Sequence, residues 1–285
     1  MGFSVIYATA PKPHKNSNDD AAGREGNIFW LMDGATQLAP PEHGLDAAWH
    51  TRRLGAEFAA LAREKPDLAL MELATTAVTT VGAEFYARSG LDAAAPQNLR
   101  PFSTLVLCRL DVARRNLEYL VLCDSTLAVV SPEREETVSD GRLDANNFLA
   151  ATNALLRAGK DFDSAEYKAA LHGVYDSSQP LLNNDGALGA WYGVTQDAKS
   201  LGQALQGEIA LAAGDNVLLM SDGFTRAVDT LGLYRNYADV LAALEEKGPF
   251  AVLDDIRAAE RADAGGAKHQ RSSRYDDATL LWVRI

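Results

Sequence analysis

Short apolar runs that end at turn residues are the most regular pattern along the chain. The run 28–32 (IFWLM) stops at Asp33-Gly34, and the run 217–220 stops one residue before Asp222-Gly223. Apolar runs of this length between turn residues are typical of buried β-strands. Further strands are expected at 3–9, 104–108, 117–123, 127–130, 190–194, 207–211 and 279–285.

Apolar residues at helical spacing occupy the intervals between groups of strands. Helices are expected from 43 to about 64 and, after the break at Pro66-Asp67, over 70–85; later ones are expected at 167–175, 224–228, 237–246 and 251–261. Groups of strands interrupted by helices favour an α+β fold over alternating βαβ units. Two antiparallel sheets flanked by helices satisfy this order. No linker divides the chain, so residues 1–285 are expected to form a single domain.

Composition narrows the classes of protein that the chain can belong to. Its 285 residues are 47% hydrophobic, enough for a large core, and the net charge of -12 argues against a nucleic-acid binder. No apolar stretch is long enough to cross a membrane, and the first residues lack a secretory signal. Cys108 and Cys123 lie in apolar runs and are expected to be buried free thiols, which fits a cytoplasmic protein.

Asp-Gly occurs four times, and a lone Asp-Gly pair usually marks a turn. Asp33-Gly34 and Asp222-Gly223 differ from the other two pairs because each follows a predicted buried strand. A carboxylate at such a strand end lies at the rim of the core, where an unpaired charge is unfavourable and a cation is the simplest partner.

Two further acidic segments lie beside predicted strands. Asn18-Asp19-Asp20 follows the first strand, and Asp276-Asp277 precedes the last one. Carboxylate oxygens suit Mg²⁺ or Mn²⁺, whereas Zn²⁺ prefers His and Cys. The five histidines have no metal-binding spacing, and most of them are expected on the surface. The acidic segments together predict an oxygen-ligand site for a divalent cation.

The order of these motifs resembles the metal-dependent serine/threonine protein phosphatases of type 2C, the PPM family, in its bacterial form. The resemblance runs from about residue 5 to residue 283. Asn18-Asp19-Asp20 is similar to the family's Asn-Glu-Asp element. The other matching segments are IFWLMDGATQ, FSTLVLCRL, LEYLVLCDSTLAVV, DNVLLMSDGF and RYDDATLLWVRI. The resemblance implies a four-layer α-β-β-α sandwich, in which helix pairs flank two antiparallel sheets.

The resemblance also implies a centre of two Mn²⁺ or Mg²⁺ ions at one end of the sandwich. Carried over by position, Asp33 would bridge both ions, and the carbonyl of Gly34 would bind one of them. Asp222 and Asp276 would bind the other ion. The implied catalytic residues are therefore Asp33, Asp222 and Asp276.

Other positions complete the implied site. Asp19 or Asp20 would contribute directly or through water, Asp124 would help Asp222 to hold a weaker third ion, and Lys15 would bind phosphate. Two ions can generate hydroxide near neutral pH and stabilise the transition state of phosphate-ester hydrolysis, so no nucleophilic side chain is needed. The implied activity is hydrolysis of phosphoserine and phosphothreonine in proteins phosphorylated by a kinase.

Three departures from the family pattern affect the groups that handle phosphate. Lys15 replaces an arginine, Ala35 replaces a histidine that eukaryotic members have, and Thr126 stands where arginine is usual. Lysine supplies charge but not the two-pronged hydrogen bonding of arginine. Two alternatives therefore stay open: a non-catalytic module of the same fold that binds phosphoproteins, and a phosphatase for small phosphorylated metabolites.

Overall fold

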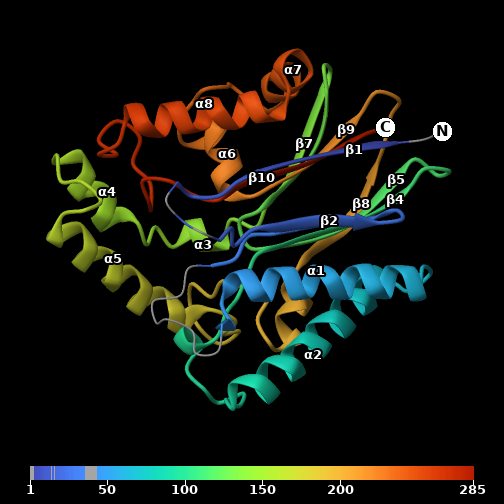
Figure 1. The fold of residues 1–285 in the computed structure, drawn as a ribbon, viewed down its shortest axis with the longest axis horizontal. Coiled ribbons are helices and arrows are strands. Elements are labelled where there is room, and N and C mark those ends of the chain that lie inside the picture. Colours follow the sequence, from blue (N-terminus) through green and yellow to red (C-terminus); the bar gives the residue numbers. More distant parts are fainter. Residues whose placement is uncertain (1–2, 14, 16, 36–43) are drawn as a thin grey trace.

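Two five-stranded antiparallel sheets form the centre of the computed structural model, which describes residues 3–13, 15, 17–35 and 44–285 (Figure 1). The first sheet has the order β1 (Ser4–Ala10), β10 (Ala278–Arg284), β9 (Asn216–Met220), β6 (Thr126–Ser131) and β7 (Arg134–Val138). The second has the order β2 (Ala21–Glu25), β3 (Ile28–Met32), β4 (Leu105–Asp111), β5 (Asn116–Leu122) and β8 (Leu205–Ala210).

Helices cover the outer face of each sheet, which gives four layers (Figure 1). The long helices α1 (Ala47–Glu64) and α2 (Leu70–Ser89) pack on the second sheet. On the first sheet lie α6 (Asp222–Asp229), α7 (Tyr237–Lys247) and α8 (Pro249–Ala262). The connection from β7 to β8 carries α3 (Arg142–Ala145), α4 (Ala150–Arg157) and α5 (Ala165–Ser178). The predicted four-layer α+β fold is confirmed, whereas the single domain over 1–285 stays a prediction.

Strand β3 shows why a central strand of this fold has a continuous run of apolar residues. Successive side chains of a strand point to opposite faces of its sheet. Phe29 and Leu31 therefore enter the core between the two sheets, while Ile28, Trp30 and Met32 enter the core beneath α1 and α2. Both faces of the strand are covered, so all five of its residues are buried.

Several boundaries differ from those predicted. Residues 190–194 form isolated bridges at Trp191 and Val194 instead of the predicted strand. The first helix begins at Ala47, and the predicted start at residue 43 lies outside the described residues. Cys108 and Cys123 are buried free thiols as predicted. Among the described helices, none combines the length and the apolar character that a membrane span requires.

His50 on α1 is buried, so it is an exception to the expectation that most histidines lie on the surface. Its side chain is 1% exposed, its Nε2 lies 3.1 Å from the carbonyl oxygen of Val194, and its Nδ1 has no hydrogen-bond partner. Burial disfavours the charged imidazolium and lowers the pKa of His50 to about 4. The folded protein therefore holds this histidine neutral.

We expect His50 to make the stability of the protein depend on pH. Below about pH 6.5 the unfolded chain binds a proton at this residue, but the folded protein does not until about pH 4. The folded state therefore loses up to about 3 kcal/mol of stability from this residue as the pH falls through that range. Urea unfolding at about pH 7 and pH 4.5 should show a smaller loss for His50→Gln than for the unaltered protein. His172→Gln, at an exposed histidine, is the control, and an equal loss in all three proteins would contradict the assignment.

Candidate metal centre

The acidic segments of the sequence meet at one end of the two sheets. In antiparallel pairs the end of one strand lies beside the start of its neighbour. Ala10 at the end of β1 is opposite Ala278 at the start of β10, and Met32 at the end of β3 is opposite Ala21 at the start of β2. Met220 at the end of β9 likewise lies opposite Leu280 near the start of β10. Asp33, just after β3, and Asp222, at the start of α6, therefore lie at the same end as the segments 18–20 and 276–277. We call Asp20, Asp33, Asp222 and Asp276 the acidic cluster.

Two glycines bring these segments into close contact. A Cβ on Gly34 would lie 2.7 Å from the carbonyl oxygen of Asp19, and a Cβ on Gly223 would lie 2.0 Å from that of Asp277. Real Cβ atoms do not approach an oxygen so closely, so each position requires glycine. Gly141 and Gly186 have no such neighbour. Only the two Asp-Gly pairs that follow buried strands thus serve to join acidic segments.

Asp33 lies at the middle of the acidic cluster. Its backbone N–H donates to Thr104 Oγ1 at 2.9 Å, and that hydroxyl is 2.6 Å from Ser125 Oγ, so the end of β3 is fixed to the neighbouring strands. Burial raises the pKa of Asp33 well above its usual range, and the other three carboxylates of the cluster raise it further. The Asp222 side chain lies within hydrogen-bonding reach of Asp33, and its pKa is also raised, mainly by burial.

Asp20 and Asp222 have buried oxygens that no described group satisfies. Both carboxylate oxygens of Asp20 and the Oδ1 atom of Asp222 lack a hydrogen-bond partner. Burial is the main reason that the pKa of Asp20 rises to about 7; the nearby Thr279 and Ser221 hydroxyls oppose the rise, and the Asp277 and Asp222 carboxylates add to it. Unpaired buried carboxylates are unfavourable, and a divalent cation with oxygen ligands relieves both the burial and the mutual repulsion.

Asp276 is paired, in contrast to the rest of the cluster. Its Oδ1 atom lies 2.7 Å from Lys12 Nζ, and its Oδ2 atom accepts from Arg226 and, at 3.1 Å, from Ser273 Oγ. Burial alone would raise the pKa of Asp276, but Arg226 and Lys12 outweigh burial and lower it to about 2. Both oxygens of this candidate metal ligand are therefore already bound to cationic side chains.

The other predicted residues lie around the cluster. Lys15, the predicted phosphate ligand, pairs with Asp19 and lies 3.8 Å from Asp277. Burial raises the pKa of Asp19, and Lys15 opposes this effect. Asp124 is at the end of β5, and burial together with the Asp222 and Asp144 carboxylates raises its pKa to about 7. The predicted site residues therefore lie at one end of the fold. Lys15, which was predicted to bind phosphate, contacts carboxylates there.

The backbone of Cys123, just before Asp124, is in the left-handed region with φ of 66°. A non-glycine residue there is strained. Asp140 counteracts the strain: its Oδ2 atom accepts from the Cys123 N–H at 3.3 Å, and its own N–H donates to the Cys123 carbonyl at 3.1 Å. Asp140, in turn, forms an ion pair with Arg142. Asp124 thus follows a residue in a left-handed conformation that glycine would adopt without strain, and here the hydrogen bonds of Asp140 stabilise that conformation.

Sequence reasoning missed Lys12 and Arg226 as members of the site, and it gave Asp277 no role beyond its place in the acidic segment 276–277. Asp277 is 2% exposed and accepts the backbone N–H groups of Lys12 at 2.7 Å and of Asp19 at 3.0 Å. The signal for Arg226 was its position four residues after Asp222, which places both on one face of α6. Lys12 carried no such signal, because its partner Asp276 is at the other end of the chain.

The donor set fits a divalent cation on one side of the cluster. Among the described residues, no three His, Cys, Asp or Glu side chains converge as a ready-made metal site. The unsatisfied oxygens of Asp20 and Asp222, beside Asp33, are nevertheless hard oxygen donors of the kind that Mg²⁺ and Mn²⁺ prefer. The side at Asp276 does not fit a second ion in this arrangement, because Lys12 and Arg226 hold that carboxylate.

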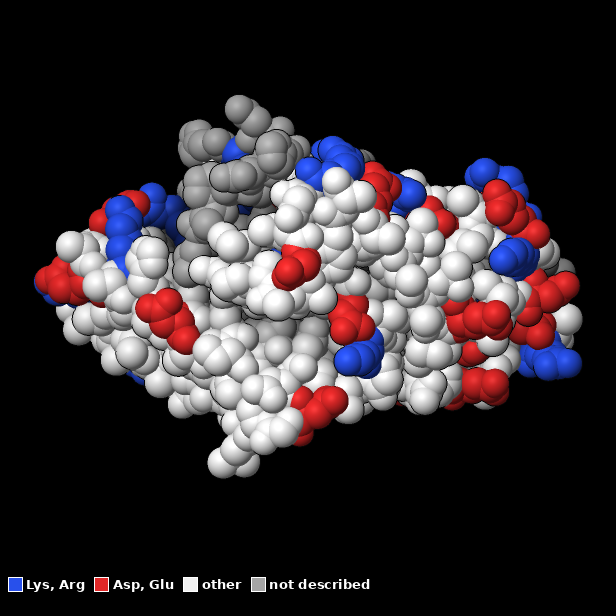
Figure 2. Space-filling view, turned by 90° about the horizontal axis from the view of Figure 1, so that it is seen from below, with Lys and Arg blue, Asp and Glu red and all other residues white. Residues whose placement is uncertain are grey.

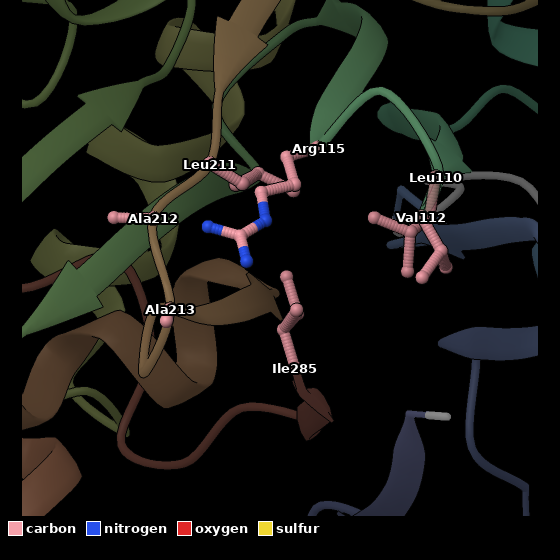
Figure 3. A pocket seen from close by; sticks show the side chains of 7 residues that line it. All are labelled: Leu110, Val112, Arg115, Leu211, Ala212, Ala213 and Ile285. Carbon is pink, nitrogen blue, oxygen red and sulfur yellow. The ribbon is translucent and has the colours of Figure 1, made fainter. Parts of the chain in front are cut away.

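Other surface features of the described residues offer less chemistry. An apolar pocket of about 120 Å³ lies at the opposite end of the strands, with Arg115 and Ile285 among its lining residues and no Asp or Glu side chain among those described (Figure 3). On the face formed by α1 and α2, basic and acidic side chains lie next to each other (Figure 2). Arg53, for example, pairs there with both Glu57 and Glu84. The acidic cluster is the strongest candidate for a functional site.

Comparison with known proteins places the fold. No family model and no curated protein matches the chain. Among solved structures, the S. agalactiae serine/threonine phosphatase is 14% identical with a TM-score of 0.60 and 100% coverage of both chains. The Mycobacterium tuberculosis serine/threonine phosphatase PstP/Ppp is 12% identical with a TM-score of 0.59, covering 99% of this chain and 98% of that one.

A third solved structure bears on the metal. The catalytic domain of the phosphatase PstP in complex with two manganese ions is 14% identical, with a TM-score of 0.55 and coverage of 99% of this chain and 97% of that one. At such identities the similarity shows the fold alone. The fold that the motif order implied is therefore confirmed.

Proposed function

We propose that the chain is a phosphatase that depends on a divalent cation and removes phosphate from phosphoserine and phosphothreonine in proteins. The observation that carries this proposal is the set of unsatisfied buried oxygens of Asp20 and Asp222 beside Asp33. Similarity to serine/threonine phosphatases over the whole chain, one of them with two manganese ions, supports it. Substrates phosphorylated by a kinase and a cytoplasmic location, favoured by the free thiols, are part of the proposal.

In this proposal Asp33 and Asp222 hold a Mn²⁺ or Mg²⁺ ion, with the Gly34 carbonyl and the Asp19-Asp20 segment beside it. When bound, the ion supplies a Lewis acid and lowers the pKa of water. The chain's own residues exclude the alternative of a thiol nucleophile, because Cys108 and Cys123 are both buried and burial raises the pKa of each thiol. Lys12 and Lys15 place two positive charges beside the carboxylates, where an anionic phosphate group needs compensation.

A non-catalytic phosphoprotein-binding module is the second candidate. The pairing of Asp276 with Lys12 and Arg226 favours it, since a phosphatase of this type is expected to use that carboxylate for metal. Ala35, where eukaryotic members have histidine, and Thr126, where arginine is usual, point the same way. Turnover of a phosphopeptide separates the two candidates.

We expect hydrolysis of a phosphothreonine peptide and of p-nitrophenyl phosphate in the presence of Mn²⁺. Chelation with excess EDTA should reduce both rates by at least about 10²-fold, and added Mn²⁺ should restore them, because the ion supplies the Lewis acid. Full activity in EDTA would contradict the proposal. Mn²⁺ binding without turnover of any phosphopeptide would favour the binding module, and turnover of small esters alone would indicate a metabolite phosphatase.

A further inference from the structure

We propose that the Lys12 ammonium group is a resident cation that takes the place of a second divalent ion beside Asp276. The acidic cluster then binds one divalent ion, on the side of Asp20, Asp33 and Asp222. The inference concerns the same site as the proposed function and rests on it only in assuming that the cluster binds a metal.

The backbone around Lys12 is held in place by contacts that reach it from two other parts of the chain. Asp277 accepts the Lys12 N–H at 2.7 Å. Arg257 of α8 donates to the carbonyl oxygens of Ala10 at 2.9 Å and Pro11 at 3.3 Å, the two residues just before Lys12. Lys12 therefore leaves the end of β1 in a fixed direction, with its side chain against Asp276.

The side chain of Lys12 is built into the cluster. It is 24% exposed, compared with 32% for Lys15, and its Nζ lies 2.7 Å from Asp276 Oδ1. Arg226, 4% exposed, occupies the other oxygen of Asp276 and also contacts Glu260 at 3.2 Å. A long side chain held at both its backbone and its charged end is a fixed part of the site.

The contrast within the cluster shows where a metal ion is needed. Among the described residues, Asp276 has donors on both oxygens, whereas Asp20 has no hydrogen-bond donor within bonding distance and Asp222 has an unsatisfied Oδ1 atom. A divalent ion that approaches Asp276 meets two positive charges and must displace Lys12. An ion that approaches Asp20 and Asp222 satisfies their free oxygens without displacing a paired side chain, and it meets the charges of Arg226 and Lys12 only from the Asp276 side of Asp222. The cluster is therefore divided into a side already neutralised by the chain and a side open to a cation.

Counting bound Mn²⁺ tests this division directly. Metal-stripped protein is titrated with Mn²⁺, and the free ion is measured by its EPR signal. We expect about one Mn²⁺ per chain for the unaltered protein and about two for Lys12→Met, because the variant removes the ammonium group from Asp276. Lys12→Arg keeps the charge and should bind about one, and Lys65→Met, at an exposed lysine, should also bind about one. Circular dichroism and thermal melting establish that each variant is folded.

A second substitution locates the added ion. Asp276→Asn in the Lys12→Met background should return the count to about one, because it removes the carboxylate that Lys12 had occupied. Two ions in the unaltered protein, or one ion in folded Lys12→Met, would overturn the inference. Phosphopeptide hydrolysis is measured on the same samples. Two bound ions with turnover would refute the inference and leave the proposed function standing. One bound ion without turnover would support the inference and refute the proposed function. No bound ion would refute both.

Discussion

Replacing Asp33 with asparagine is expected to reduce Mn²⁺-dependent phosphatase activity by at least about 10³-fold, which is the larger of the two strongest effects that the structure predicts. Asp33 lies at the middle of the acidic cluster, where its carboxylate interacts with those of Asp20, Asp222 and Asp276. Asparagine has the same size and leaves the backbone hydrogen bond to Thr104 intact, but it contributes no charge to a bound cation. Rates of phosphopeptide hydrolysis across a Mn²⁺ titration measure the effect.

The same substitution should change stability in a way that a folding defect would not. Asp33→Asn removes one of several buried like charges, so the metal-free variant should melt at or above the temperature of the unaltered protein. It should, however, lose most of the increase in melting temperature that Mn²⁺ causes in the unaltered protein. Asp185→Asn, at an exposed Asp-Gly pair, is the matched control and should behave like the unaltered protein. An Asp33→Asn variant with normal turnover would exclude Asp33 as a metal ligand.

Sequence reasoning predicted the buried strands well because burial leaves a direct trace in the residues. Strand β3, buried on both faces, is an unbroken apolar run. The edge strand β7 (REETV) pairs only with β6 and is largely exposed, so its sequence has no apolar pattern, and it was not predicted. The apolar segment 190–194 has the composition of a strand but makes only isolated bridges, because no neighbouring strand runs beside it.

In the candidate site, too, some features could be predicted from the sequence and others could not. The convergence of the segments 18–20, 33–34, 222–223 and 276–277 followed from their positions at predicted strand ends and from the motif order. The requirement for glycine at Gly34 and Gly223 follows from contacts across the fold, with Asp19 and Asp277, that no local pattern encodes. The pairing of Lys12 with Asp276 joins a residue just after the end of β1 to a residue just before the start of β10, so it depends on the register of that strand pair. Local sequence thus indicates the carboxylates, whereas the balance of charge among them depends on the tertiary structure.

Replacing Glu260 with alanine is expected to destabilise the protein by about 3–5 kcal/mol. Glu260 on α8 is fully buried, and its two oxygens accept from Arg226 at 3.2 Å and Arg257 at 2.7 Å. Removing its carboxylate leaves Arg257 without a carboxylate partner among the described residues and leaves Arg226 with Asp276 alone. Because these arginines also bind Asp276 and the carbonyls of Ala10 and Pro11, the loss extends to the support of the site.

Urea unfolding of three variants distinguishes the stability lost by removing a buried charge from the stability lost by removing an exposed ion pair. Glu260→Gln keeps acceptor capacity and side-chain volume but not the charge, so it should lose less stability than Glu260→Ala. Glu245→Ala removes an exposed carboxylate 3.8 Å from Arg284, and an exposed pair of this kind contributes at most about 1 kcal/mol. Equal stability losses for Glu260→Ala and Glu245→Ala would mean that the arginines find other partners or water. The larger loss at Glu260 would establish that the two arginines behind the acidic cluster depend on this buried carboxylate for their position, and one of them, Arg226, lowers the pKa of Asp276.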